Sequence, residues 1–259
     1  MTFDFTGKVA LVTGGESGIG ASIAKELSRL GCAIIITYFT KVELAESVLT
    51  EANNNGLQNL IVKCDIRDEG SVINLFNRAK NTFGKIDFLI NSAGIRSHDK
   101  PLADLSLSDF KNTIATNLFG VFLCAKYFIN QHEQFRDGRI INITSIHQEI
   151  VSASKTDYCA SKFGVKGLSK ALALEVAEKN ITVNCIAPGM VLTPMNEKAI
   201  DDLNYRAEQE KRIPLQYAAL PIEVANMAIF LCSPQAKYIT GTTQIVDGGL
   251  SLNRSKGAK

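Results

Sequence analysis

Short apolar runs rich in β-branched residues alternate with helical segments along almost the whole chain. The runs expected to form strands are 8–13, 33–38, 60–64, 86–91, 139–144, 182–187 and 243–246. Segments with helical spacing of apolar residues are 21–30, 42–53, 69–82, 108–131, 156–179 and 223–231. Apolar strands separated by helices form parallel sheets that are covered on both faces. The sequence therefore predicts the α/β class, with one doubly wound (Rossmann) domain built on a seven-stranded parallel sheet.

The length of the chain fits one domain of this kind. With 259 residues, 46% of them hydrophobic, the chain can fill a sizeable core. It contains no internal repeat, linker or low-complexity block, so we expect a single catalytic domain over 1–259. A polar segment at 196–212, expected to be helical, interrupts the alternation and predicts a lid at about 190–215. A short tail is expected at about 251–259.

Charge and hydropathy exclude several classes of partner. The 28 basic and 26 acidic residues give a formal net charge of +2 and are interspersed, apart from a short basic tail with Arg254, Lys256 and Lys259. We expect no nucleic-acid partner. No stretch approaches the ~18 apolar residues of a membrane span, and the amino terminus lacks a signal-like apolar region. The sequence therefore predicts a cytoplasmic protein that acts on a small molecule.

The cysteines carry no pattern of their own. They occur singly and mostly inside apolar runs, at Cys32, Cys64, Cys124, Cys159, Cys185 and Cys232. Neither the pairing of a disulfide framework nor the CxxC spacing of a zinc site is present. We interpret them as reduced core residues and expect no metal site.

A glycine-rich turn follows the first strand. The run 8–13 ends in Gly14-Gly15-Glu16-Ser17-Gly18-Ile19-Gly20, and helical spacing begins directly afterwards. Glycines let the backbone approach a pyrophosphate, and the amino-terminal end of the helix presents free N–H groups and a positive dipole end to it. In this strand–turn–helix setting the turn predicts dinucleotide binding.

A second notable feature is the pair Tyr158 and Lys162, which lie four residues apart in a segment expected to be helical. Side chains at this spacing lie on one face of a helix. An ammonium about 4 Å from a phenol could lower the pKa of the tyrosine by up to ~3 units, toward working pH. The pair could then transfer protons. The alternative is that both residues form the solvated edge of an amphipathic helix.

The motifs occur together in an arrangement that resembles the short-chain dehydrogenase/reductase family. The resemblance covers about residues 7–250 and rests on Thr13-Gly14-xxx-Gly18-Ile19-Gly20, Asn91-Ser92-Ala93-Gly94, Asn117, Ser145, Tyr158-xxx-Lys162 and Pro188-Gly189. In one place the chain departs from the family pattern, because Ser92 stands where that pattern has a second asparagine.

The resemblance implies a role for each of four catalytic residues. Tyr158 would be the general acid/base, and Lys162 would lower its pKa and hold the ribose hydroxyls of the cofactor. Ser145 would hydrogen-bond the substrate oxygen, and Asn117 would hold a water that links Lys162 to solvent. Taken alone, Ser145 could be a helix cap and Asn117 a backbone contact.

The resemblance also implies a nicotinamide cofactor, NAD or NADP. Asp65 would meet the adenine amino group with Ile66 on the ring, and the loop after the sixth strand would hold the carboxamide. The full set of implied cofactor-binding residues is Gly14, Ser17, Gly18, Ile19, Gly20, Tyr38, Asp65, Ile66, Asn91, Ala93, Gly94, Tyr158, Lys162, Pro188, Gly189, Val191 and Thr193.

The choice between NAD and NADP stays open at this point. An acidic residue at the end of the second strand would favour NAD, whereas a basic residue there or in the glycine turn would favour NADP. The chain offers the segment 37–41 and the pair Glu16-Ser17. Lys41 could reach a phosphate, but a solvated lysine at the start of a helix is an equal alternative.

The substrate is indicated only by resemblance. The run 144–149, with Tyr38 and Asp247-Gly248-Gly249, is most similar to bacterial glucose 1-dehydrogenases, which implies a sugar substrate such as glucose. Ser145, His147 and Tyr158 would then contact it. Phe39 stands where that subgroup has an arginine, and 151–155 replaces an aromatic segment.

Two other functions share parts of this pattern. A 3-oxoacyl-carrier-protein reductase has a similar overall pattern but would favour a basic residue in the glycine turn. A non-catalytic NAD(P)-sensing protein would show damage to Ser145, Tyr158 or Lys162, and all three are intact. The resemblance also implies a homotetramer built on the long helices expected at 108–131 and 156–179.

Overall fold

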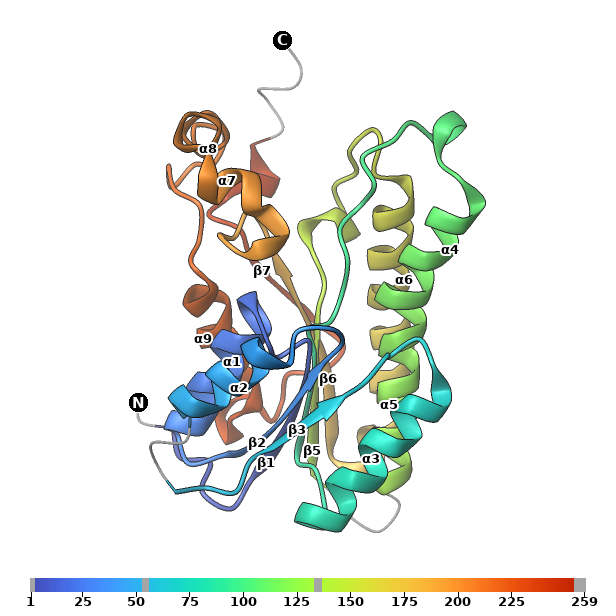
Figure 1. Ribbon diagram of the computed structural model, residues 1–259, viewed down its shortest axis with the longest axis vertical. Helices are drawn as coiled ribbons and strands as arrows, with labels where there is room; N and C mark the ends of the chain where they lie inside the picture. Colours follow the sequence, from blue (N-terminus) through green and yellow to red (C-terminus); the bar gives the residue numbers. More distant parts are fainter. Residues whose placement is uncertain (1–2, 53–55, 133–136, 254–259) are drawn as a thin grey trace.

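The fold is a parallel sheet between two layers of helices (Figure 1). The computed structural model describes residues 3–52, 56–132 and 137–253. Within them the sheet has seven strands in the order β3-β2-β1-β4-β5-β6-β7, and every neighbouring pair is parallel. The strands are β1 (Val9–Thr13), β2 (Ala33–Tyr38), β3 (Leu60–Lys63), β4 (Phe88–Asn91), β5 (Gly138–Ile143), β6 (Ile181–Pro188) and β7 (Thr243–Val246). The predicted doubly wound sheet is confirmed.

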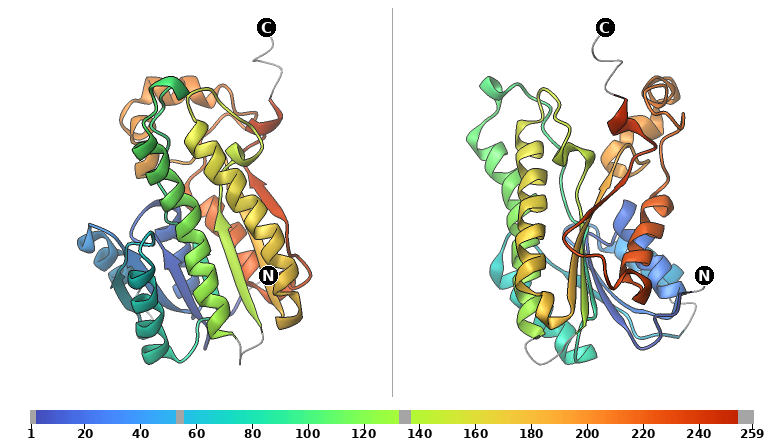
Figure 2. Two further views of the ribbon diagram at one scale, coloured as in Figure 1. Left: turned by 90° about the vertical axis from the view of Figure 1, so that its right-hand side faces the viewer. Right: turned by 180° about the vertical axis from the view of Figure 1, so that it is seen from behind.

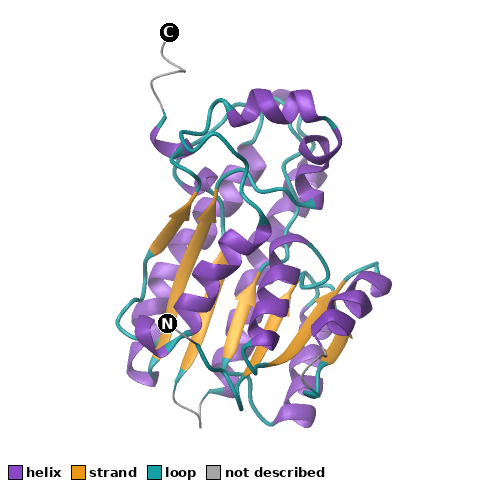
Figure 3. Ribbon diagram, turned by 90° about the vertical axis from the view of Figure 1, so that its left-hand side faces the viewer, coloured by secondary structure: helices purple, strands orange, loops and turns teal. Residues whose placement is uncertain are grey.

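Helices cover both faces of the sheet. The α-helices of the described residues are α1 (Gly18–Arg29), α2 (Val42–Ala52), α3 (Glu69–Phe83), α4 (Leu107–Ile114), α5 (Gly120–Gln131), α6 (Thr156–Glu175), α7 (Glu197–Asp201), α8 (Leu203–Glu210) and α9 (Pro221–Cys232). One face carries α1, α2 and α9 (Figure 3), and the other carries α3 to α6 (Figure 2, left). Side chains of the strands therefore alternate between two cores, with Ile34 and Ile36 in one and Ile35 in the other.

The strand order reverses between β1 and β4, which are neighbours in the sheet although β2 and β3 come between them in the sequence. In open parallel sheets the ligand site lies at such a switch point, outside the carboxyl ends of the strands. The loops after β1, β4 and β5 therefore meet where a site is expected.

The helix expected at 108–131 is present, but one of its turns is wider than a regular α-helical turn. A π-helical turn, Ala115–Phe119, separates α4 from α5. At its end, a Cβ on Gly120 would lie 2.5 Å from Cδ1 of Ile66, so glycine allows the close approach of this helix to the loop after β3. Regular 3.6-residue spacing gave no sign of the wider turn, which adds one residue to the helix locally.

The polar segment 196–212 is helical, as expected, but consists of two short helices. The chain leaves the helical conformation at Asp202, between α7 and α8, and the Asp202 carboxylate accepts a hydrogen bond from Tyr205 N at 2.9 Å. The predicted closure of helix 42–53 at Asn53 and the basic tail from Arg254 lie outside the described residues.

The six cysteines are buried and carry free thiols, in agreement with their interpretation as core residues. Burial raises the pKa of several of these thiols, among them Cys32 and Cys64. None of the helices in the described part of the chain is long and apolar enough to cross a membrane.

Candidate active site

A cavity of about 890 Å³ lies at the carboxyl ends of the strands. Its walls come from the loops after β1 to β6, from α6 and from the α7–α8 segment. Most predicted site residues line it: Gly14, Ser17, Gly18, Ile19, Tyr38, Asp65, Ile66, Ala93, Gly94, Ser145, His147, Tyr158, Lys162, Pro188, Gly189, Val191 and Thr193. Gly20, Asn91 and Asn117 are absent from the lining and lie behind it.

The glycine turn forms a close cradle at one end of the cavity. Gly14 and Gly18 have φ values of +62° and +53°, which favour glycine, and a Cβ on Gly14 would lie 2.7 Å from Cα of Ala93. A Cβ on Gly20 would lie 2.3 Å from the Gly14 carbonyl oxygen. The side chain of the N-cap residue Ser17 accepts no hydrogen bond from the first turn of α1. The N–H groups of that turn therefore have no side-chain cap. These features fit the pyrophosphate of a dinucleotide.

Tyr158 lies one turn before Lys162 on α6, in contact with the end of β5. The Ser145 hydroxyl lies near the Tyr158 phenol and lowers the pKa of that phenol. Lys162 Nζ lies 5.5 Å from the centroid of the Tyr158 ring and donates to the Ile143 carbonyl oxygen at 3.1 Å. The structure thus brings Ser145, Tyr158 and Lys162 together on one wall of the cavity.

The pKa of Tyr158 differs from the sequence-based expectation. Burial raises the pKa of Tyr158 to about 12, although the Ser145 hydroxyl opposes this rise. Burial also lowers the pKa of Lys162 to about 8. The ammonium is directed at a backbone carbonyl and lies over the ring, so its attraction for a phenolate oxygen is weaker than that of the direct contact expected from the sequence. Tyr158 is therefore a protonated phenol at neutral pH, suited to donate a proton.

Asn117 lies in the π-helical turn and is almost fully buried. Its Oδ1 accepts from Ile95 N at 2.8 Å, and its Nδ2 donates to the Ile95 carbonyl at 2.9 Å and to Ser161 Oγ at 3.2 Å. The side chain thus fixes the loop after β4 beside α6. The role in holding a water beside Lys162 stays a prediction.

His147 faces the cavity from the turn after β5. Its Nδ1 lies 2.8 Å from the Ile150 carbonyl oxygen, which can only accept, so Nδ1 carries the proton and Nε2 is an acceptor. Burial lowers the pKa of His147, which keeps the ring neutral. The ring meets that of Tyr158 edge to face at 6.0 Å.

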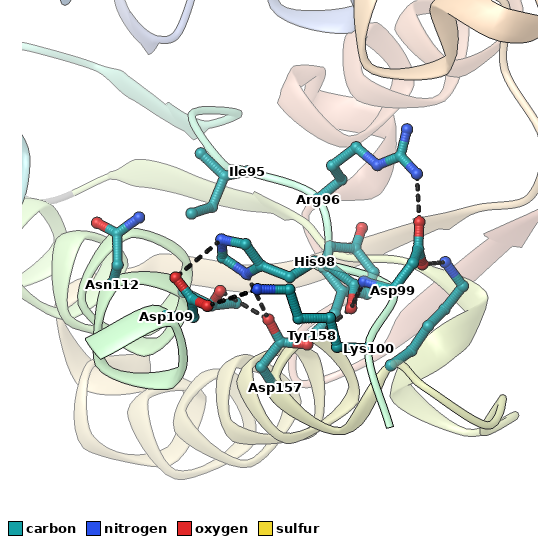
Figure 4. Close-up of polar contacts among 12 residues, drawn as sticks. Ile95, Arg96, His98, Asp99, Lys100, Asp109, Asn112, Asp157 and Tyr158 are labelled. Atoms are coloured by element: carbon teal, nitrogen blue, oxygen red, sulfur yellow. Dashed lines mark hydrogen bonds and ion pairs between the residues drawn. The ribbon is translucent and has the colours of Figure 1, made fainter. Parts of the chain in front are cut away.

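A polar cluster that the sequence did not indicate lies behind Tyr158 (Figure 4). Asp157, next to Tyr158 and almost fully buried, accepts from Ser97 Oγ at 2.7 Å and from Thr113 Oγ1 at 2.8 Å. His98 Nδ1 lies 3.3 Å from the same carboxylate. These contacts fasten the loop after β4 to α6 and so hold one side of the cavity. An aspartate inside an apolar helix face was the one available signal.

The predicted adenine contact, Asp65, is engaged with Arg67 in this structure. Arg67 Nε and an Nη donate to the two oxygens of Asp65 at 2.8 and 2.7 Å, and its other Nη donates to Asn112 Oδ1 at 2.8 Å. The guanidinium also lies 5.2 Å from the centroid of the Phe39 ring. The hydrogen bonds from Arg67 hold the pKa of Asp65 below its usual value. An adenine contact by Asp65 stays a prediction.

We predict that residues 196–212, called the lid here, become less accessible when cofactor and substrate bind. Lys198, Tyr205 and Arg212 line the cavity, so ligands held there would contact the segment and reduce its motion. Tryptic cleavage after Lys198, Arg206 and Lys211 should slow in the ternary complex. Cleavage after the exposed Arg29 on α1 is the internal reference, and equal slowing at every site would contradict a lid.

Comparisons with known proteins agree with this geometry. A family model described as enoyl-(acyl carrier protein) reductase matches residues 14–251. Glucose 1-dehydrogenase 2 of Bacillus subtilis is 35% identical over 98% of both chains. A 3-oxoacyl-(acyl-carrier-protein) reductase of Staphylococcus epidermidis is 36% identical over 95% of this chain and 99% of its own. A solved short-chain dehydrogenase/reductase of Serratia marcescens superimposes with a TM-score of 0.89 at 32% identity, over 95% and 98% of the two chains.

The fold and the site define an oxidoreductase of the Rossmann type that uses a nicotinamide dinucleotide. The chain belongs to the short-chain dehydrogenase/reductase family, and it is an NAD(P)-dependent enzyme of that family. The resemblance on which the sequence-based prediction rested is confirmed. Its relatives act on different substrates by name, so they do not select one for this chain.

Proposed function

We propose that the enzyme transfers a hydride between the nicotinamide cofactor and a secondary alcohol or its carbonyl, with a sugar such as glucose as the leading substrate. The observation that carries this proposal is that Ser145 and Tyr158 line the same cavity, with Lys162 one helical turn from Tyr158. A bound cofactor supplies or accepts the hydride. Side chains of the enzyme must hold the substrate oxygen and donate a proton to it.

In this proposal, each side chain of the site has its own role in the reaction. Ser145 hydrogen-bonds the substrate oxygen and Tyr158 donates a proton to it as negative charge develops during reduction. In the oxidation direction the proton returns to Tyr158, and a nearby positive charge on Lys162 favours that step. The glycine cradle and the loop with Pro188 and Gly189 hold the two ends of the dinucleotide.

A sugar substrate is supported by the polar character of the wall beside the catalytic pair. Nε2 of His147 is an acceptor, and Arg96 and Lys155 also line the cavity from the neighbouring loops. Arg96 and Lys155 both form ion pairs with the Asp99 carboxylate, which fixes the position of that carboxylate. Hydroxyl groups could donate to His147 and Asp99.

The test is a panel of sugars, 3-oxoacyl thioesters and simple ketones, assayed with NAD and NADP separately by the absorbance of the reduced nicotinamide. We expect the highest kcat/KM with a sugar. A 3-oxoacyl thioester as the preferred substrate would instead support the alternative function, which the similarity to the S. epidermidis reductase favours. Nucleotide binding without turnover on the whole panel would support the sensing alternative.

We also propose that the enzyme is a homotetramer that assembles through α5 and α6. Phe122 on α5 is 47% exposed and Leu174 on α6 is 83% exposed, and Phe163 on α6 and Phe119 in the turn before α5 are also exposed. Their burial against second copies would stabilise an assembly. The molar mass by light scattering should be four times that of the chain, and the Phe122→Asp protein should be smaller. A monomeric wild type would contradict this assembly.

A further inference from the structure

The end of the cavity nearest β2 has an unusual acidic group. Where a carboxylate at the end of the second strand would mark an NAD enzyme, this chain has Tyr38 and Phe39. Glu16 lies at the same end of the cavity, because the glycine turn packs against β2: a Cβ on Gly15 would lie 2.9 Å from Cγ2 of Ile36. Glu16, Tyr38, Phe39 and Thr40 all line the cavity.

One oxygen of this carboxylate lacks a partner. Glu16 Oε2 has no hydrogen bond and no contact with solvent in the structure. A buried acceptor without a donor is costly, so such groups call for a structural reason. Burial raises the pKa of Glu16, and the backbone N–H groups of Glu16 and Phe39 oppose that rise. A ligand hydroxyl beside Glu16 would supply the missing donor.

The other charges at this end do not offset Glu16. Among the described residues, the ones that carry charge at this end of the lining are Glu16, Asp65 and Arg67. Asp65 and Arg67 form an ion pair through two hydrogen bonds, which leaves Glu16 as the unbalanced charge. Lys41, the candidate phosphate ligand in the sequence, is exposed and is not part of the lining.

We propose that Glu16 makes the enzyme select NAD(H) over NADP(H), by accepting a hydrogen bond from the 2′-hydroxyl of the adenosine ribose and by repelling a 2′-phosphate. This inference rests on dinucleotide binding in the cavity and adds the choice between the two cofactors. A phosphate monoester carries about −1.5 to −2 charge at neutral pH, so it would be repelled by the Glu16 carboxylate, while Arg67 is already paired with Asp65.

The test measures dissociation constants of NADH and NADPH by isothermal titration calorimetry, with no substrate present. The wild type should bind NADH roughly tenfold or more tightly than NADPH, in the range of a hydrogen bond to a charged group. Glu16→Gln, which keeps the acceptor and removes the charge, should bind NADPH better. Glu16→Ala should also bind NADH roughly tenfold less tightly. In both variants, the dissociation constant of NADPH divided by that of NADH should therefore be smaller than in the wild type.

Two control variants separate this role of Glu16 from a general effect of surface charge and from a role of Lys41. Glu43→Gln makes the same change on the exposed side of α2, away from the cavity, and should leave both constants unchanged. Lys41→Ala should leave NADPH affinity unchanged. A loss of NADPH affinity in this variant would assign the ribose end to Lys41 and overturn the proposal.

Equal affinities of the wild type for NADH and NADPH would overturn the role of Glu16 alone, whereas binding of neither dinucleotide would overturn the proposed function as well. Thermal unfolding of each variant shows that it is folded.

Discussion

The Tyr158→Phe enzyme is expected to lose about 10²- to 10⁴-fold in kcat and to bind the nicotinamide cofactor almost as tightly as the wild type. The substitution removes the phenolic oxygen and keeps the ring, which packs edge to face with His147 at 6.0 Å. Ser145 then has no proton donor beside it. The split between kcat and cofactor affinity is measured by steady-state kinetics and by calorimetric titration of the same preparation.

Tyr127→Phe is the matched control for this experiment. Tyr127 lies on α5, where its hydroxyl donates to Glu69 at 2.8 Å, and it is not part of the cavity lining. Its loss should leave kcat unchanged. If Tyr158→Phe keeps a substantial fraction of kcat, another group carries the proton and the assigned role is wrong.

Replacement of Lys162 by methionine should change how stability depends on pH. The pKa of Lys162 is about 8 in the folded protein, against an ordinary value of 10.5, because of burial. The unfolded chain therefore binds more protons between these pH values, so the free energy of unfolding of the wild type should rise with pH in this window. The rise due to this one group is up to about 3 kcal/mol, and Lys162→Met should lack it.

Denaturant unfolding across the pH window between the two pKa values of Lys162 measures the difference between the two proteins. Lys170→Met, on the exposed side of the same helix, should follow the wild type. Lys162→Met should also bind the cofactor more weakly and shift its pH–rate profile toward alkaline pH, because a positive charge is lost beside Tyr158. Parallel stability curves for wild type and Lys162→Met would show that the ammonium carries no burial penalty in the fold.

Much of the fold was predictable because local patterns and tertiary packing agree. The strands at 33–38 and 243–246 have the predicted bounds, since both are short runs rich in β-branched residues. Ser145, Tyr158 and Lys162 were predicted as a group, and the structure brings them together because the amino-terminal part of α6 packs beside the turn after β5.

Other features depend on contacts that no local pattern encodes. The π-helical turn at Ala115–Phe119 arises within a segment of regular apolar spacing, and its close contact is with Ile66, about fifty residues away in the chain. The high pKa of Tyr158 follows from burial and from the position of Lys162 Nζ, which spacing of four residues does not set. The buried carboxylate of Asp157 finds its partners, Ser97 and Thr113, on other elements of the fold.

The π-helical turn makes the α4–α5 segment sensitive to length. The wider turn accommodates one extra residue, so loss of one residue from 115–119 would return it to a regular α-helix. Cys124 and Phe128 of α5 could then stay in the core, but Asn117 would lose the placement in which it faces Ile95. Chimeras between this enzyme and its relatives should therefore be joined outside this turn, and natural insertions or deletions should avoid it.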